Sequence, residues 1–483
     1  MEIVGGVVQD GGMRKWSPLI AICLGAFMLL VDVTIVVVAL PAMSDHLDTS
    51  MADLQWVLDG YALALAALLL GAGTIADRIG RRRVYAAGLA IFAVSSAACG
   101  LAPNAEVLIA ARCVQGIGAA AMFATTMALL NQHYQGRDRG IAFGVWGAIN
   151  GAAAATGPIV GGLLTEHAGW RWIFLVNLPV SIITVIMVYW VLRESRGDAH
   201  RRVDVGGMLT FTLAAAATVY GLVHAGQDGW SDPTTLAGLG VGAAALVAFL
   251  LIEVRHPQPM LDLALFRRPG FVGLMVGSLL ISWAAFAYLA FTSIWLQIAL
   301  GFGPVDAGLA LLPMSLTALV VAGIAGRRLA DVSPRWTISA GLALIAAGAF
   351  LQTSLDASSG RWAIAVGLIV SGVGVGLATP PLASAAMSSV PIERGGMASG
   401  AVNTFRQLGY ALGIAVLGTV FADHLTGTGS RRAAFADAVN AVCVVSGIVG
   451  AVAAVIVFWL VRRPAPTAAS GTSPQRDLVA ALD

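Results

Sequence analysis

Apolar runs long enough to cross a membrane recur along almost the whole chain. About 20 apolar residues in a helix span the ~30 Å hydrocarbon core of a bilayer, and the 483 residues contain fourteen such runs. Hydrophobic residues make up 58% of the chain and charged residues only 11%, unlike a water-soluble domain. The sequence therefore predicts an all-α integral membrane protein. The predicted spans are residues 17–40, 53–76, 84–102, 106–130, 140–163, 172–192, 206–226, 234–254, 270–294, 304–327, 335–354, 361–384, 397–420 and 438–461.

The distribution of basic residues predicts the orientation of the chain. Most of the 28 Lys and Arg residues fall in every second loop, and positive charge concentrates on the cytoplasmic side of membrane proteins. Both termini are then cytoplasmic, in a multi-pass protein of the cytoplasmic membrane. Residues 462–483 are expected to form a disordered cytoplasmic tail. Six basic residues depart from this charge pattern. Four lie in outer loops, Arg171, Arg361, Arg431 and Arg432, and two lie inside spans, Arg112 and Arg406.

A weak internal repeat divides the chain into two halves. A segment rich in Gly, Asp and Arg at residues 73–83 has a shorter echo at residues 326–331, as expected of a transporter built from two related bundles. We therefore expect an N-terminal six-helix bundle at residues 17–192 and a C-terminal six-helix bundle at residues 270–461. Residues 193–269 would form a linker that contains the two extra spans.

The segment at residues 73–83 also suggests a conformational role. Asp77 can pair with Arg78 or Arg81 across a tight turn at Gly80, and such a charge-assisted pair can hold a helix bundle in one state. The alternative is a run of positive charge that only orients the chain. The arginines alone fit the alternative, whereas the whole pattern favours a conformational latch. Its predicted members are Gly73, Asp77, Arg78, Gly80, Arg81 and Arg82.

Three charged residues lie at similar depth in the outer half of the predicted membrane region. By helix rise, Asp32 is about 12 Å, and Asp59 and Arg112 about 9 Å, from the outer ends of their spans. Ionisable residues at such depth normally face a bundle interior or a watery cavity. Burial favours a neutral carboxyl and a nearby arginine favours the carboxylate, so changes in water access can move a proton on and off Asp32. We predict that Asp32 carries protons and Arg112 tunes it, with a fixed salt bridge as the alternative.

For Asp59 and Arg406 the sequence leaves two roles open. Asp59 lies near the membrane surface, where it is either solvated or takes part in substrate binding or a second proton transfer. If Asp59 faces the cavity, it favours cationic substrates, because an incoming cation relieves an unpaired carboxylate. Arg406 lies about 14 Å deep by helix rise without an obvious acid in a span. Contact with helix carbonyl ends is slightly favoured for Arg406 over substrate contact.

Four segments carry motifs in the same order as a known family: residues 30–41, 73–82, 108–119 and 157–162. Together they resemble the major facilitator superfamily, and specifically its fourteen-span drug:proton antiporter branch. The first motif departs from the usual pattern, because Val37 stands where Asn is common. The last motif is associated with antiporters, and its members are Gly157, Pro158, Gly161 and Gly162.

The resemblance implies the major facilitator fold, with two six-helix bundles plus two extra transmembrane helices. It also implies a proton-coupled antiporter that exports small amphipathic, preferably cationic, drugs or toxic metabolites, with Arg112 linked to the coupling. The alternatives are a dedicated exporter of one endogenous product and a non-transporting membrane sensor of the same fold. The expected partners are a small-molecule substrate, protons and the lipid bilayer. No nucleic acid is expected, and the protein is expected to be a monomer.

The sequence does not indicate an enzyme, a metal site or a cofactor. The seven histidines are scattered, mostly in loops, and the four cysteines all lie in apolar runs, where a thiol usually acts as a small hydrophobic group. No Gly-rich phosphate-binding loop with its lysine is present, so ATP is not expected to drive the protein directly.

Overall fold

The computed structural model describes residues 7–49, 51–196, 204–257, 259–329, 332–425 and 430–461, and every described element is a helix. The predicted tail at residues 462–483, the first part of the linker at residues 197–203 and Asp331 lie outside these residues. The helices are α1 (Val7–Leu47), α2 (Met51–Ile79), α3 (Arg81–Gly100), α4 (Ala105–His133), α5 (Gly136–His167), α6 (Trp172–Leu175), α7 (Asn177–Val191), α8 (Val205–Asp228), α9 (Pro233–Arg255), η1 (Leu263–Arg267), α10 (Pro269–Ser282), η2 (Trp283–Ala287), α11 (Tyr288–Ile294), η3 (Trp295–Ala299), α12 (Pro304–Arg328), α13 (Pro334–Phe350), η4 (Arg361–Ile364), α14 (Ala365–Ser388), η5 (Ile392–Arg394), α15 (Gly395–His424) and α16 (Arg431–Leu460).

Twelve helical segments of the described chain are long and apolar enough to cross a membrane. Two further long helices, α5 with 32 residues and α13 with 17, are not among the twelve. At 1.5 Å per residue, α13 reaches about 26 Å, slightly short of the ~30 Å hydrocarbon core. The predicted all-helical membrane fold is therefore confirmed, whereas the predicted number of fourteen spans is not established and depends on α5 and α13.

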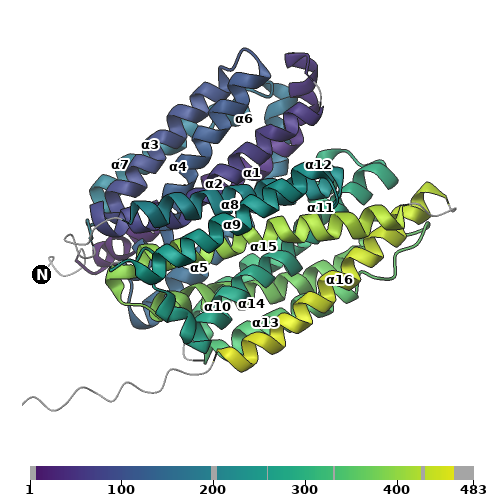
Figure 1. Ribbon diagram of the computed structural model, residues 1–483. Coiled ribbons are helices and arrows are strands. Elements are labelled where there is room, and N and C mark those ends of the chain that lie inside the picture. The colour runs from purple at the N-terminus through teal and green to yellow at the C-terminus, as the bar shows by residue number, and fades with distance from the viewer. Residues whose placement is uncertain are drawn as a thin grey trace, which may run out of the picture.

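The helices run roughly side by side (Figure 1). We call α1–α7, which precede the α8–α9 hairpin in the chain, the first group, and α10–α16, which follow it, the second group. The groups meet along α5 with α12 and along α2 with α15. Glycine allows the first of these contacts to be close: a Cβ atom on Gly144 would lie 2.9 Å from the Cα of Gly326. Small residues let helix axes approach in lipid, where apolar side chains gain little from leaving the solvent. The interface between the groups is therefore built from backbone contacts.

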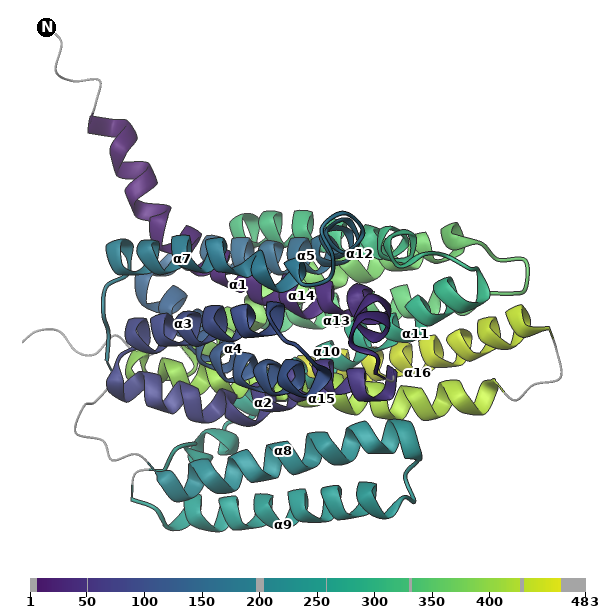
Figure 2. The same cartoon turned by 90° about the horizontal axis from the view of Figure 1, so that it is seen from above.

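The α8–α9 hairpin lies on one side of the two groups (Figure 2). Its helix α8 packs against both α2 and α15. Met208 of α8 covers Gly71 of α2, and the indole Nε1 of Trp230, in the turn after α8, donates to the Thr419 hydroxyl of α15 at 2.7 Å. The hairpin thus covers the line along which α2 and α15 meet.

The helix at residues 269–299 is interrupted by two π-helical turns, η2 and η3. The first begins at Trp283 and the second at Trp295, and Trp295 is almost fully buried. The sequence analysis predicted an ordinary span here, because π turns have no clear sequence pattern. Such turns redirect the side chains that follow them and are frequent at functional sites.

Candidate functional site

The carboxylate of Asp32 in α1 lies at the centre of a buried hydrogen-bond network. Arg112 Nη1 of α4 donates to Asp32 Oδ2 at 2.6 Å. Two amides bind the other oxygen: Gln115 Nε2 at 3.0 Å and Asn177 Nδ2 at 2.8 Å. The exposed fraction is 0% for Asp32 and 1% for Arg112. The predicted pairing of these two charges is therefore present, in a site that solvent does not reach.

Further contacts fix the position of the Arg112 guanidinium. Its Nε donates to the carbonyl oxygen of Val57 in α2 at 3.0 Å, and its Nη1 also donates to Gln115 Oε1 at 2.7 Å. The guanidinium carbon lies 4.2 Å from the centre of the Tyr61 ring, which allows a cation–π interaction. The arginine therefore ties α1, α2 and α4 together.

Both members of the buried ion pair have hydrogen-bond partners. A buried ion pair lasts only where hydrogen bonds satisfy both charges, and three donors surround Asp32. Protonation would remove the negative charge and leave the Arg112 cation without its counterion. The ion pair and its hydrogen bonds therefore link α1, α2, α4 and α7 at one buried point.

Asp59 of α2 does not belong to the Asp32 network. It is half-buried, and His224 of α8 lies near enough to interact with it electrostatically. Aromatic rings on the same two helices lie close together: the Trp56 and Tyr220 centroids are 5.9 Å apart. The structure thus brings together two of the three charges predicted at this depth and leaves Asp59 beside the α8–α9 hairpin.

Asp77 connects the two groups of helices at one end of the bundle. Its carboxylate accepts hydrogen bonds from the backbone N–H groups of Gly396, at 2.8 Å, and Met397, at 3.0 Å, at the start of α15. Arg81 donates to Asp77 Oδ1 at 2.9 and 3.0 Å, and also donates to the Ile392 carbonyl. The helix N-terminus suits the carboxylate, because its N–H groups have no partner within the helix. Of the two arginines expected to pair with Asp77, Arg81 does so.

The other predicted latch residues have separate surroundings. Gly80 has a φ of 126°, a left-handed conformation that suits glycine. Glu194 packs against it and accepts a hydrogen bond from the backbone N–H of Arg82 at 3.1 Å. The Arg82 side chain donates to the Leu192 carbonyl at 3.1 Å. Arg78 is exposed and has no hydrogen bond or ion pair within the described ranges. Arg82 therefore binds the end of α7, while Arg81 contacts the opposite group.

A second contact closes the same end of the bundle. Arg139, near the start of α5, donates to the Ser388 hydroxyl at the end of α14 at 2.5 Å. Arg394 pairs with Asp262, in the segment between α9 and η1. Both groups of helices and the segment after the hairpin thus contribute polar side chains to this end, which we call the Asp77 end.

Comparison with known proteins places this architecture in a family. The family model of the Major Facilitator Superfamily matches residues 22–414. The chain belongs to this superfamily. The Multidrug resistance protein Stp of Mycobacterium tuberculosis is 37% identical over 411 residues, which cover 85% of this chain and 76% of that protein. The Tetracenomycin C resistance and export protein of Streptomyces glaucescens is 34% identical, with 85% and 77% covered.

Two further comparisons agree with this family assignment. The Puromycin resistance protein pur8 of Streptomyces alboniger is 35% identical, over 90% of this chain and 86% of that protein. The crystal structure of the human organic anion transporter MFSD10 aligns with a TM-score of 0.65, over 92% of this chain and 99% of that chain, at 15% identity. That structural likeness shows the fold alone. The protein is therefore a membrane-embedded Major Facilitator Superfamily transporter.

The predicted antiporter motif lies in α5, where it packs against α1. A Cβ atom on Gly157 would lie 2.8 Å from the Cβ of Thr34, and one on Gly161 would lie 2.9 Å from the carbonyl oxygen of Ile35. A Cβ atom on Gly162 would meet Val305 of α12 instead. The side chain of Pro158 lies outside the described residues. The glycines allow α5 to contact α1 and α12 at once, close to Asp32 in the sequence of α1.

Gly157→Ala is expected to destabilise this superfamily member. The added methyl group would overlap Thr34, and overpacking of this kind lowers the free energy of unfolding by about 1–3 kcal/mol. Unfolding of the purified protein in detergent and denaturant would measure the change. Gly240→Ala in α9 is the matched control, because no heavy atom lies within 4 Å of the added methyl group. Equal stability of the two variants would contradict the expected overlap.

Sequence reasoning did not assign Ser96 and Asn177 to the site. The Ser96 hydroxyl accepts a hydrogen bond from Asn177 Nδ2 at 3.0 Å, and the same amide group binds Asp32. Polar residues inside predicted spans were the available signal. Asn177 and Asp32 are 145 residues apart in the chain, so only the packing of α7 on α1 reveals their contact.

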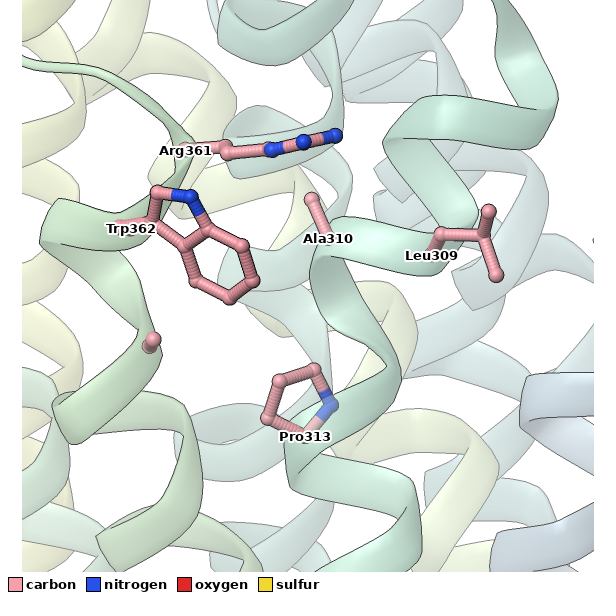
Figure 3. A pocket seen from close by; sticks show the side chains of 6 residues that line it. Leu309, Ala310, Pro313, Arg361 and Trp362 are labelled. Atoms are coloured by element: carbon pink, nitrogen blue, oxygen red, sulfur yellow. The ribbon is translucent and has the colours of Figure 1, made fainter.

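A small cavity lies between α12 and the start of α14 (Figure 3). Its volume is about 150 Å³, and Arg361 and Trp362 lie at one side of it. Sites for drug-sized ligands usually enclose about 300–1,000 Å³, so this cavity is smaller than such sites. The remaining lining residues are Leu309, Ala310, Pro313 and Ala365.

Proposed function

We propose that the protein is a proton-coupled antiporter that exports small amphipathic drugs or toxic metabolites across the cytoplasmic membrane. The observation that carries this proposal is the buried pair of Asp32 and Arg112. A membrane-buried carboxylate with an arginine counterion is costly for a merely structural purpose and is most often functional. The relatives named above are resistance and export proteins, which supports outward transport of the substrate.

In the proposed cycle, Asp32 takes up a proton when its site opens to the outside and releases it when the site opens to the cytoplasm. Protonation removes the charge that holds Arg112, so the contacts between α1 and α4 weaken while the proton is bound. Release of the proton restores the ion pair. The change in these contacts would favour one orientation of the two helix groups over the other.

The latch would act at the other stage of the cycle. With both termini cytoplasmic, as the distribution of charge predicts, the Asp77 end faces the cytoplasm. The bonds from Asp77 to Gly396 and Met397 would then hold the two bundles together while the transporter is open to the outside. We propose fourteen spans, counting α5 and α13, with bundles at residues 17–192 and 270–461, and a monomeric transporter.

The charge of the substrate is part of this proposal. Asp59 is half-buried beside α8, and its carboxylate would favour a cationic group on the substrate if the substrate path reaches this side of α2. The names of the relatives support either a broad or a narrow substrate specificity. The name of Stp describes multidrug resistance, whereas the Streptomyces glaucescens protein is named for one compound. A dedicated exporter of one endogenous product is therefore the second candidate.

Transport by purified protein in liposomes would test the proposed function. A fluorescent lipophilic cation inside the vesicles should leave faster when the outside is acidic, and each exchange should carry protons inward. A pH-sensitive dye would detect these protons. Dye movement that ignores the pH gradient would refute proton coupling. Proton movement with only one compound of a chemically varied set would favour the dedicated exporter.

A further inference from the structure

Arg406 lies inside a membrane-spanning helix, and no described residue pairs with it. It is half-buried in α15, and within the described ranges it forms no hydrogen bond or ion pair. A structural role would require contact with helix carbonyl groups, and the described chain provides none. An unpaired cation at membrane depth is costly and is a functional candidate by default. The guanidinium of Arg406 is therefore free to bind a ligand.

The face of α15 that precedes Arg406 contacts the first group of helices. Ser399 and Asn403 both donate to the carbonyl oxygen of Phe123 in α4, at 3.4 and 3.2 Å. Asn403 is nearly fully buried by this contact. Arg406 follows Asn403 by three residues, which is almost one helical turn. It therefore lies just beyond the point where α15 and α4 touch.

The other side of α15 contacts the second group. A Cβ atom on Gly409 would lie 2.7 Å from the Leu279 carbonyl carbon, and one on Gly413 would lie 3.2 Å from Trp283 Cγ. With 3.6 residues per turn, Arg406 projects between this side and the side that faces α4. The Arg406 side chain therefore leaves α15 between its contacts with α4 and with α10.

A second unused donor lies on the neighbouring helix. The indole Nε1 of Trp283 is buried and has no hydrogen-bond partner among the residues that the structure describes. Trp283 begins the π-helical turn η2, a distortion that is frequent at functional sites. Tyr410, one turn after Arg406, has an exposed fraction of 43% and adds an aromatic surface. Trp283 contacts Gly413, which follows Arg406 by seven residues, or about 10 Å along the axis of α15, on the same side of this helix. Two donors that lack acceptors among the described residues therefore lie along one side of α15, together with an aromatic ring.

We propose that Arg406 and Trp283 form a subsite for an anionic oxygen on an aromatic substrate, either a carboxylate, a phenolate or an enolate. The guanidinium supplies charge-assisted hydrogen bonds, and the indole N–H supplies a further donor. This proposal rests on the proposed export function, because the bound molecule is the exported substrate. It concerns one group of the substrate and is compatible with a cationic group elsewhere that Asp59 would favour.

Equilibrium binding to the purified full-length protein in lipid nanodiscs tests the subsite. The probes are a rhodamine with a free carboxyl group on its pendant phenyl ring and the methyl ester of the same dye. We expect the intact protein to bind the acid about 10- to 100-fold more tightly, as for a hydrogen bond to a charged group. Arg406→Gln should abolish this preference by weakening binding of the acid alone. Arg406→Lys should retain part of this preference for the acid. Trp283→Phe should reduce the preference about threefold to tenfold.

Arg431→Gln, at the exposed start of α16, is the control and should keep the full preference. Thermal unfolding checks that each variant folds. The proposal is overturned if the intact protein binds the ester equally well or binds neither dye, or if Arg406→Gln keeps the preference. If Arg406→Gln does not fold, an unchanged preference in both Arg406→Lys and Trp283→Phe overturns it. Binding without a gradient does not depend on proton coupling, so proton movement in liposomes reports separately on the proposed function.

Discussion

Asp32→Asn is expected to reduce gradient-driven efflux to the level of protein-free vesicles. Asparagine keeps the size of the side chain but cannot exchange a proton, and it leaves the buried cation of Arg112 without a counterion. Breaking a buried ion pair on one side costs about 3–5 kcal/mol of stability, so folding of the variant must be checked. Asp32→Glu keeps a carboxyl group and should recover part of the driven efflux.

Exchange without a gradient separates coupling from substrate binding. Vesicles loaded with unlabelled substrate should still exchange it for labelled substrate through Asp32→Asn, provided that the variant folds. Asp228→Asn, at the exposed end of α8, is the control and should transport normally. Full gradient-driven efflux by Asp32→Asn would show that Asp32 does not carry the coupled proton and would favour the fixed salt bridge.

The pairing of Asp32 with Arg112 was predictable because depth along a helix follows from counting residues. Two charges at similar depth in neighbouring spans have few other partners in lipid. The same count placed Asp59 at this depth, yet Asp59 faces α8. Depth gives the layer of a residue but not its direction around the helix axis, and that direction depends on which helices pack against it. The partners supplied by distant segments, such as Asn177, could not be predicted for the same reason.

The latch shows a different limit of sequence reasoning. The sequence predicts an internal pair of Asp77 with Arg78 or Arg81, and in the structure Asp77 forms an ion pair with Arg81. The contacts that join the two groups are backbone N–H groups of Gly396 and Met397. Backbone groups are the same in every sequence, so no residue pattern identifies them as the partners of Asp77. Only the packing of α2 on α15 does so.

Gly73→Ala is expected to prevent closure of the Asp77 end. A Cβ atom on Gly73 would lie 2.8 Å from the carbonyl carbon of Gly396, whose position in the backbone of α15 leaves it little freedom to move. If overpacking disfavours the closed arrangement by about 1–3 kcal/mol, the equilibrium constant for closure falls about fivefold to 150-fold. Labelling of an introduced cysteine, Ser399→Cys, by a membrane-impermeant reagent applied from the Asp77 end would measure the change.

Gly323→Ala in α12 is the matched control, because no heavy atom lies within 4 Å of its added methyl group. It should leave labelling and transport unchanged.

Asp77→Asn should also increase labelling, since it removes the negative charge that the α15 N-terminus and Arg81 stabilise, without adding bulk. The two variants act by different physical causes, one by overlap and one by lost electrostatic attraction. Salt screens charges but does not relieve steric overlap. High salt should therefore leave the effect of Gly73→Ala on labelling unchanged. It should reduce the difference in labelling between Asp77→Asn and the intact protein. Unchanged labelling in Gly73→Ala would mean that α2 and α15 separate during most of the cycle and that the latch does not control access.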